Sequence, residues 1–339
     1  MTRDMASTLS PIDFVIPWVD GSDPEWQNER ARWKEEETES VHSFDYCDWG
    51  LLPYWFRSIE KNAPWVRRIH FITCGQLPDW LDTGHPKLHI VRHSDYIPAQ
   101  YLPTFSSHVI ELNLHRIPEL SEQFIYFNDD TFLLNPVMPT DFFRNGKPCD
   151  SALMSPVVAA NRETVAILQL HVSAILNEHF NKKEVIRKNR LQWYNLKYGL
   201  RGLLNYFFIP WPYFPGFYEQ HLAASYLKST FEEVWKTEYE ALDQTCRHRF
   251  RNYREDVNQY LIKEWQLAKG DFHPRKTGFG RFLSVNKSDD AASACALLRS
   301  KIKSICINDH LEGDDVTDAI RQIKIGFQER FPEKSSFEL

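Results

Sequence analysis

Cysteine is scarce in this sequence and shows no pattern. The six residues stand at Cys47, Cys74, Cys149, Cys246, Cys295 and Cys306, and no two of them have the C-x-x-C spacing. Structural zinc sites and disulfide frameworks are recognised by such spacings. The sequence therefore indicates neither, and we expect reduced thiols in a cytoplasmic protein.

Long apolar segments are absent as well. The N-terminal MTRDMASTLSP has no apolar core of the kind that secretory signals carry. No run approaches the roughly 18 apolar residues of a membrane-spanning helix. The stretch from Leu203 to Tyr218 is rich in aromatic residues, but prolines interrupt it. Peripheral contact with a membrane surface stays open.

An excess of positive charge is the third missing feature. Lys and Arg number 40 against 46 Asp and Glu, which gives a net charge of −6. A dedicated nucleic-acid binder would need a basic footprint, so we expect no nucleic acid among the partners. Aromatic residues, by contrast, make up 14% of the chain. They fill cores, but they also line clefts that bind sugars and bases.

Short apolar runs alternate with helical patterns along much of the chain. Apolar residues lead into Asp20, and the runs RRIHFITC, LHIVRH, EQFIYFNDD and KSICIND have the length of buried strands. Helical patterns are predicted from Pro24 to about Glu36, from Asp48 to Lys61, from Ser107 to Arg116 and from about Val316 to Arg330. This alternation predicts an α/β fold with a largely parallel sheet.

The pattern changes after about residue 160. Segments 163–200 and 219–268 favour helices, and the loop IPWPYFPGFYEQ separates them. Segment 271–300 is expected to be irregular in part. We therefore predict an α/β nucleotide-sugar-binding core over 1–160, a helical subdomain on the acceptor side over 161–270, and a segment that completes the core over 271–339. The aromatic residues from Trp211 to Tyr218 are expected near the acceptor.

Three predicted strands end in acidic or amide side chains. These ends are Asp20 to Asp23, Asn128-Asp129-Asp130, and Asn308-Asp309. Ligands of open α/β sheets bind at the carboxyl ends of strands, and Mg²⁺ takes carboxylates together with phosphate oxygens. Asp and Asn also form turns and helix caps there, which is the simpler interpretation of any one of the three. The three together favour a metal site.

Two further candidates are weak when taken alone. His221 follows the aromatic loop, and a lone histidine is more often structural than catalytic. Arg251 lies in RHRFRNYRED, which is compatible with a solvated helix face or with a clamp on phosphate oxygens.

Together these motifs resemble the Stealth family of sugar-phosphate transferases. Four regions match in order: DFVIPWVDGSDPEW at 13–26, the stretch from about Phe44 to Leu134, the stretch from about His221 to Tyr260 with HRFRNYREDVNQY, and CIND at 306–309 followed by FPEKSSFE. The third region has one extra residue between Arg251 and Asp256, so Arg249 and Arg254 compete with Arg251 for its role. The first region has IPWVDG, whereas many members of the family have Thr or Ser before the Trp.

The resemblance implies a Rossmann-type core similar to GT-A glycosyltransferases, with a helical subdomain. It also implies the site residues. The essential acidic residues of the family correspond to Glu111 and Asp130, its essential histidine to His221 and its essential arginine to Arg251. The residues expected to bind substrate are Trp18, Val19, Asp20, Gly21, Ser22, Asp23, Arg116 and Asn128. The expected ligands of Mg²⁺ or Mn²⁺ are Asp129, Asp130 and Asp309.

The reaction that this resemblance implies is transfer of a hexose-1-phosphate from a UDP-sugar to a hydroxyl of an oligo- or polysaccharide, with release of UMP. Asp130 would hold the cation with Asp129 or Asp309, Arg251 would stabilise the phosphate, and His221 would take the hydroxyl proton. Glu111 would orient His221 or the donor sugar. The expected setting is capsular or exopolysaccharide synthesis in the cytoplasm. A metal-dependent glycosyltransferase that releases UDP and a non-catalytic glycan-binding protein are the alternatives.

Overall fold

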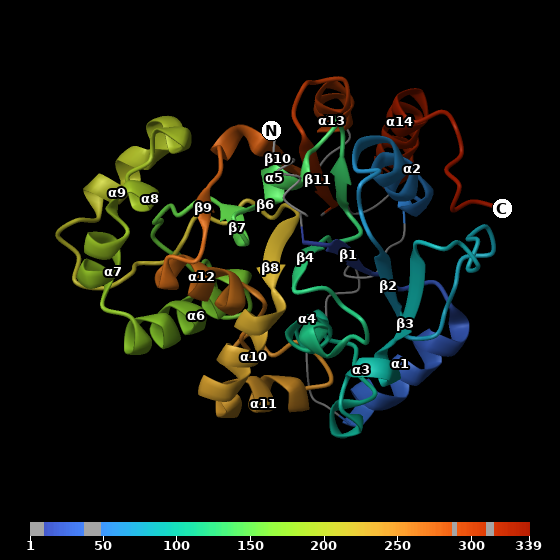
Figure 1. Ribbon diagram of the computed structural model, residues 1–339. Helices are drawn as coiled ribbons and strands as arrows, with labels where there is room; N and C mark the ends of the chain where they lie inside the picture. Colours follow the sequence, from blue (N-terminus) through green and yellow to red (C-terminus); the bar gives the residue numbers. More distant parts are fainter. Residues whose placement is uncertain (1–9, 37–48, 287–289, 310–314) are drawn as a thin grey trace, which may run out of the picture.

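A five-stranded sheet lies at the centre of the protein, in the order β3-β2-β1-β4-β8 (Figure 1). The structure is a computed structural model that describes residues 10–36, 49–286, 290–309 and 315–339. The strands of the central sheet are β1 (Ile12–Pro17), β2 (Ile69–Thr73), β3 (Leu88–Arg92), β4 (Gln123–Tyr126) and β8 (Ala224–Leu227). The first four are parallel, and β8 is antiparallel to β4.

Both faces of this sheet are covered, which explains why apolar residues on its strands point to both faces. Successive residues of a strand point to opposite faces. In β1, Val15 packs into one hydrophobic core, whereas Phe14 and Ile16 pack into another on the opposite face. A parallel sheet that is buried on both faces reads as a continuous apolar run. The α/β class that the sequence predicts is confirmed.

The strand order fixes where a ligand can bind. The chain builds β1, β2 and β3 outward in one direction and then returns to place β4 on the other side of β1. Ligands of such sheets bind outside the carboxyl ends of the strands, at the point where the order reverses. That point lies between the ends of β1 and β4, which are followed by Trp18 and by Asn128 to Asp130.

Three helices around the parallel strands lie close to their predicted positions: α1 (Pro24–Glu36), α2 (Leu52–Asn62) and α4 (Ser107–Leu112). A short helix α3 (His93–Tyr96) and a 3₁₀ turn (Ala99–Tyr101) were not predicted, and a second 3₁₀ turn (Leu114–Arg116) follows α4. Helix α4 ends four residues before the predicted boundary, because the backbone tightens into the second 3₁₀ turn after Asn113.

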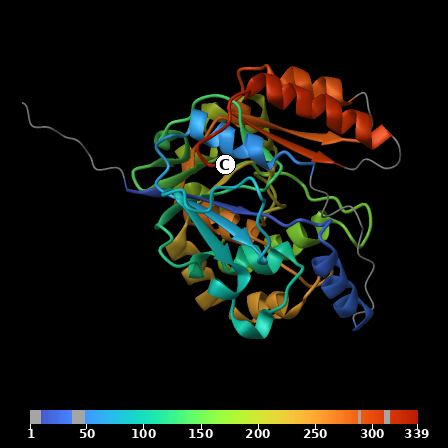
Figure 2. The ribbon, with the colours of Figure 1, turned by 90° about the vertical axis from the view of Figure 1, so that its right-hand side faces the viewer.

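A smaller sheet packs beside α2 and carries two helices on its outer side (Figure 2). Its elements are β5 (Thr131–Leu133), β10 (Gly280–Val285), β11 (Ser304–Asp309), α13 (Asp290–Leu298) and α14 (Asp315–Arg330). The sequence did not reveal β10 or α13. Gly280 is needed at the start of β10, since a Cβ atom there would lie 2.6 Å from the carbonyl oxygen of Ser304.

Helices dominate residues 165–269. They are α6 (Val165–His179), α7 (Lys182–Lys188), α8 (Arg190–Trp193), α9 (Leu203–Phe207), α10 (Lys228–Thr237), α11 (Tyr239–Arg247) and α12 (Tyr260–Lys269). Strand β8 interrupts them and joins the central sheet. The predicted division at residues 160 and 270 stays a prediction. The remaining regular elements are a 3₁₀ segment (Leu196–Gly202), a 3₁₀ turn (Thr277–Phe279), α5 (Pro139–Phe142) and a small sheet of β6 (Phe143–Arg144), β7 (Lys147–Asp150) and β9 (His273–Pro274).

The structure can be compared with two expectations from the sequence, that there is no membrane-spanning helix and that the cysteines are reduced. Within the described ranges, no helix has both the length and the apolar character that crossing a membrane requires. Five cysteines, Cys74, Cys149, Cys246, Cys295 and Cys306, carry free thiols. Cys47 lies outside the described residues.

One buried charge ties the central sheet together. The Asp13 carboxylate in β1 is fully buried and accepts hydrogen bonds from Arg67 Nε at 2.7 Å, from the Ser121 backbone N–H at 2.8 Å and from His70 Nε2 at 3.1 Å. Burial alone would raise the pKa of Asp13, but the bonds from His70, Arg67 and Ser121 outweigh it and lower the pKa to about 2. Asp13 therefore stays ionised and joins β1 to the starts of β2 and β4.

Replacing Asp13 should destabilise the fold. Asp13→Ala leaves His70 and Arg67 without their partner, and we expect a loss of about 3–5 kcal/mol in the free energy of unfolding. In the wild type, a lowered carboxyl pKa stabilises the protein above about pH 4, and this contribution is lost as the pH falls towards the folded-state pKa. Urea unfolding at several pH values measures both effects. The exposed Asp79→Ala is the matched control, and an equal loss there would contradict this account.

Candidate active site

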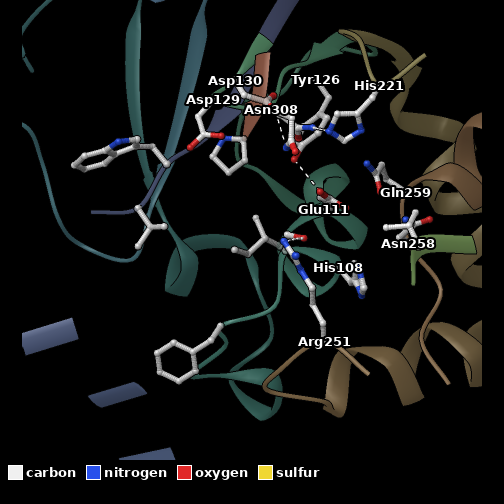
Figure 3. A pocket seen from close by; sticks show the side chains of 18 of the residues that line it. His108, Glu111, Tyr126, Asp129, Asp130, His221, Arg251, Asn258, Gln259 and Asn308 are labelled. Carbon is white, nitrogen blue, oxygen red and sulfur yellow. Dashed lines mark hydrogen bonds between the residues drawn. The ribbon is translucent and has the colours of Figure 1, made fainter. Parts of the chain in front are cut away.

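A cleft of about 610 Å³ opens where the strand order reverses, at the ends of β1 and β4. One wall follows the end of β1, with Pro17, Trp18 and Val19, and the floor follows β4, with Asn128 to Asp130. The opposite wall comes from α4, from residues 251–260 and from Val165 and Leu168 of α6. In Figure 3, Glu111 of α4, Asp130 after β4 and Arg251 converge on the cleft from segments that are far apart in the sequence.

Asp130 lies at the floor of the cleft among polar groups. Its Oδ2 accepts hydrogen bonds from Cys306 Sγ at 3.1 Å and from Asn308 Nδ2 at 3.3 Å, both on β11. Asp130, His221 and Cys306 each place a ligand atom within 4.8 Å of the others, which is the spacing of a metal site. Burial, reinforced by the Asp130 carboxylate, raises the pKa of the Cys306 thiol well above its usual value.

The other two predicted metal ligands differ in their positions. Asp129 is exposed and lines the cleft. Asp309 is the last residue of β11, and its side chain lies outside the described part of the structure. Asp129 and Asn308 thus line the same cleft as Asp130 and His221, but among the described residues the cluster of possible ligand atoms is Asp130, His221 and Cys306.

His221 enters the cleft from a constrained backbone. Its φ of 47° is in the left-handed region, which costs energy for a residue with a Cβ atom. Its ring nitrogens contact Asn128 Nδ2 at 3.0 Å through Nε2 and Tyr260 Oη at 2.9 Å through Nδ1. With the Asn128 amide donating to Nε2, the Nδ1–H donates to Tyr260. Both contacts hold the ring beside the floor of the cleft.

Glu111 is the buried carboxyl group of the cleft, on α4. Tyr126 Oη, at the end of β4, donates a hydrogen bond to Glu111 Oε1 at 2.9 Å. Burial raises the pKa of Glu111 to about 7, although the Tyr126 hydrogen bond and the positive charge of Arg251 oppose this shift. A carboxyl group that titrates near neutral pH inside a cleft is a candidate acid or base.

Arg251 lines the cleft below Glu111, and its two competitors do not. Its Nη2 donates a hydrogen bond at 3.1 Å to Oγ of Ser107, the first residue of α4. The guanidinium of Arg249 instead lies over the Trp33 ring at 4.1 Å, and Arg254 lies 3.9 Å from Glu163. Of the three arginines that the sequence motif offered, the structure places Arg251 in the cleft.

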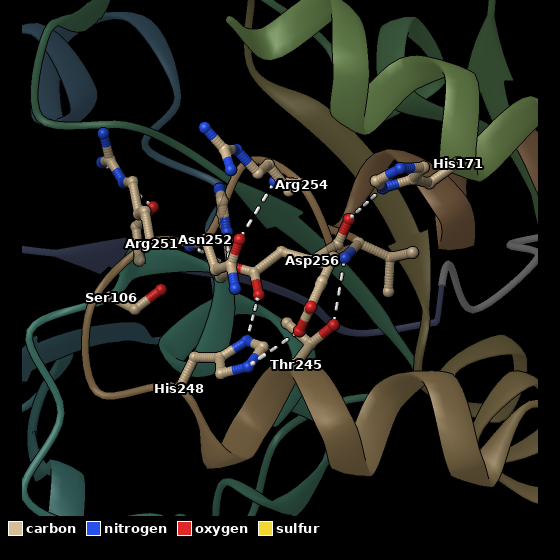
Figure 4. Close-up of polar contacts among 12 residues, drawn as sticks. Ser106, His171, Thr245, His248, Arg251, Asn252, Arg254 and Asp256 are labelled. Carbon is tan, nitrogen blue, oxygen red and sulfur yellow. Dashed lines mark hydrogen bonds and ion pairs between the residues drawn. The ribbon is translucent and has the colours of Figure 1, made fainter. Parts of the chain in front are cut away.

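A buried carboxylate, Asp256, holds the loop that carries Arg251 (Figure 4). Its Oδ1 accepts from His248 Nδ1 at 2.7 Å, and its Oδ2 accepts from His108 Nδ1 at 2.8 Å and from the Asn252 backbone N–H at 2.9 Å. The backbone carbonyl of Asp256 accepts from His171 Nδ1 at 3.0 Å. Asp256 thus connects the Arg251 loop to α4, three residues from Glu111, and to α6.

The WVDGSD turn divides into two parts. Trp18 and Val19 line the cleft. The Asp20 side chain accepts from the Ser22 backbone N–H at 2.9 Å, and Asp23 Oδ1 accepts from the Glu25 and Trp26 backbone N–H groups at the start of α1. Asp20 and Asp23 therefore form a turn and a helix cap, while Gly21 and Ser22 lie within that turn. None of these four residues lines the cleft that the structure describes.

Two other sequence expectations lie away from the cleft. Arg116 places its guanidinium 4.9 Å from the centre of the Trp235 ring and donates to Asn113 Oδ1 at 3.0 Å. In the aromatic loop, Phe214 is buried in the core, whereas Tyr213 is exposed. Neither Arg116 nor any residue from Trp211 to Tyr218 lines the described cleft.

Several side chains of the site were not singled out from the sequence. Cys306 and Asn308 stand in the CIND motif and Asp256 in the third matched region, so the motifs themselves could have indicated them. Tyr126 and Tyr260 carried no signal, because only the fold brings their hydroxyl groups to Glu111 and His221.

Two models of conserved regions match the first half of the chain. The family models described as Stealth protein CR1, conserved region 1, and Stealth protein CR2, conserved region 2, match residues 10–38 and 45–150. These matches overlap the first two regions predicted from the sequence. The third and fourth regions stay predictions.

Similarity to two curated proteins extends over almost the whole chain. A capsular polysaccharide phosphotransferase WcwK of Streptococcus pneumoniae is 42% identical over 334 residues, which cover 97% of this chain and 98% of that protein. The exopolysaccharide phosphotransferase cps2G of Lactiplantibacillus plantarum is 36% identical and covers 96% of each chain.

Among solved structures, the galactosyltransferase LgtC in complex with donor and acceptor sugar analogs is 9% identical, with a TM-score of 0.40 over 96% of this chain and 98% of that one. The curated relatives, aligned from end to end, establish the family directly: the chain is a member of the Stealth family and a phosphotransferase.

Proposed function

We propose that this enzyme transfers a hexose-1-phosphate, N-acetylhexosamine-1-phosphate among the candidates, from a UDP-sugar to a hydroxyl of a capsular polysaccharide or exopolysaccharide. The observation that carries the proposal is that Glu111, Asp130, His221 and Arg251 line one cleft at the switch point of the sheet. The polysaccharide acceptor is inferred from the names of the curated relatives. We place the reaction in the cytoplasm, in keeping with a sequence whose cysteines show no disulfide spacing.

The proposed reaction joins the acceptor oxygen to the β-phosphorus of the donor. The bond between the β-phosphorus and the oxygen that bridges to the α-phosphate breaks, UMP leaves with that oxygen, and a sugar phosphodiester remains. Phosphoryl transfer depends mainly on positioning and on stabilisation of charge. We assign the phosphate oxygens to Arg251, whose planar guanidinium suits bidentate contact.

The proton of the acceptor hydroxyl needs a base that is ionised near neutral pH. We assign this role to Glu111 in place of His221, because burial raises the pKa of Glu111 to about 7. The ring of His221 belongs instead to the cluster with Asp130 and Cys306, the group that could hold a metal ion. We therefore place His221 beside the diphosphate and its cation.

The donor set at the floor fits a divalent cation. Asp130 offers a carboxylate and His221 an imidazole within one cluster. Asp129 lines the same cleft, and the phosphate oxygens of the donor would supply further oxygen ligands of the kind that suit Mg²⁺ or Mn²⁺. The buried Cys306 thiol, whose pKa is raised, instead donates to Asp130 and orients that carboxylate. A cation held there would supply positive charge to the diphosphate.

The nucleotide product tests the proposed function. Incubation with a panel of UDP-sugars and a capsular oligosaccharide should release UMP and add the mass of a sugar phosphate to the acceptor. Mass spectrometry of both products measures this. Release of UDP, with only a sugar added, would show that the anomeric carbon is attacked and would overturn the proposal.

Activity should require the cation. Exhaustive dialysis against EDTA should abolish turnover, and Mg²⁺ or Mn²⁺ should restore it. Asp130→Asn keeps the shape of the side chain but loses a charged ligand, so it should need more cation for half-maximal activity and bind the donor more weakly. The control is Asp141→Asn, whose carboxylate pairs with Lys303 outside the described cleft. Full activity in EDTA contradicts the metal site.

The pH profile should identify the base. If Glu111 must be ionised, kcat/KM rises with pH through about 7. Glu111→Gln should lose this limb together with roughly 10²–10⁴-fold in rate. Tyr126→Phe removes a hydrogen bond that lowers the pKa of Glu111, so it should move the limb to higher pH. A limb that persists in Glu111→Gln and disappears in His221→Ala would return the role to His221.

A further inference from the structure

The surface formed by residues 191–213 is unusually apolar for a surface in contact with water. Leu196 is 98% exposed and Leu191 is 83% exposed. We call the exposed set the apolar face: Leu191, Leu196, Leu200, Leu203, Tyr206, Phe207, Ile209, Trp211 and Tyr213. It covers α8, α9 and the segments beside them, in the lobe farthest from β3 (Figure 1). Exposed apolar patches of this kind mark interaction surfaces.

Buried polar contacts hold this face in place. Asn205, on the inner side of α9, donates to the carbonyl oxygens of Ala152 at 2.8 Å and Trp193 at 2.6 Å and accepts from the Met154 backbone N–H at 2.8 Å. The buried Lys182 ammonium donates to the carbonyl oxygens of Phe208 and Trp211. Since the inner side is anchored and also apolar, Leu203 and Phe207 are presented outward by the fold itself.

Basic side chains are concentrated in the segments that carry the apolar face and in α7 directly before them. Six exposed Lys and Arg residues stand against one exposed acidic residue, Glu184, in the stretch 183–201, while the whole chain carries −6. The six are Lys183, Arg187, Lys188, Arg190, Lys197 and Arg201. This local positive charge selects an anionic partner. It also opposes pairing with a second copy, because two such faces would repel each other.

We propose that the apolar face and its six basic residues dock the enzyme on a membrane that contains anionic lipids. Apolar side chains that enter the interfacial region, with Trp and Tyr at the level of the headgroups and Lys and Arg at the lipid charges, are the features of a peripheral membrane surface. No residue of this surface lines the described cleft, so docking is separate from catalysis. The proposal holds whichever donor sugar the enzyme uses.

Vesicle co-sedimentation tests the proposal. The full chain should bind vesicles of phosphatidylcholine with phosphatidylglycerol and bind phosphatidylcholine alone much more weakly. Leu203→Gln with Phe207→Gln should weaken binding at least tenfold. Arg187→Gln with Arg190→Gln should also weaken it, by about fivefold per charge removed, and only on anionic vesicles. Turnover of a water-soluble acceptor should stay unchanged in both variants, which shows that they are folded.

Matched controls are available on other faces of the protein. Ile325→Gln removes an exposed apolar side chain from α14, and Lys236→Gln with Lys301→Gln removes two exposed charges; these variants should bind as the wild type does. Equal binding to both vesicle types, or apolar-face variants that bind as tightly as the controls, would overturn the proposal. A concentration-dependent dimer that the Leu203 and Phe207 changes dissociate, without vesicle binding, would assign the face to a second copy instead.

Discussion

The hydrogen bonds to the buried carboxylate of Asp256 are the interaction on which the geometry of the candidate active site depends. This carboxylate is fully buried and accepts hydrogen bonds from two imidazoles and a backbone amide. Burial alone would raise the pKa of Asp256, but the bonds from His108 and His248 outweigh it and keep the pKa below its usual value. An ionised carboxylate without partners in this position would be strongly destabilising. The loop that carries Arg251, helix α4 with His108 and helix α6 with His171 must therefore keep this arrangement.

The side chains that Asp256 holds in position lie beside the crevice that the order of the strands creates. The order of the strands opens a crevice between β1 and β4, and β4 delivers Tyr126, Asn128 and Asp130 to its floor. Helix α4 contributes Glu111 from the opposite side, and the loop held by Asp256 contributes Arg251. The site thus combines a rigid sheet edge with a wall that is positioned by a buried polar network. In this account, the sheet holds the diphosphate and α4 and the loop act on the reacting phosphate and hydroxyl.

Much of the site could be predicted from the sequence, because its residues stand in local motifs. The strand that ends in NDD, the helix with Glu111 and the motif with Arg251 were identified, and the fold brings them to one cleft. The sequence did not distinguish the residues that line the cleft from their neighbours in the same motifs. Asp20 and Asp23 serve a turn and a helix cap, and Arg116 stacks on Trp235. Strand β10 and the hydrogen bond from His108 to Asp256 were not foreseen, because each depends on a partner elsewhere in the chain: β10 pairs with β11, and His108 lies 148 residues from Asp256.

A double-mutant cycle tests most directly whether Asp256 acts by positioning Arg251. Asp256→Asn, Arg251→Ala and the double variant are compared by kcat/KM, with thermal unfolding as a check that each is folded. If Asp256 works through Arg251, its replacement should cost at least about tenfold less when Arg251 is already absent, which corresponds to a coupling of about 1.4 kcal/mol. Losses that multiply, so that Asp256→Asn costs the same with and without Arg251, would contradict the account.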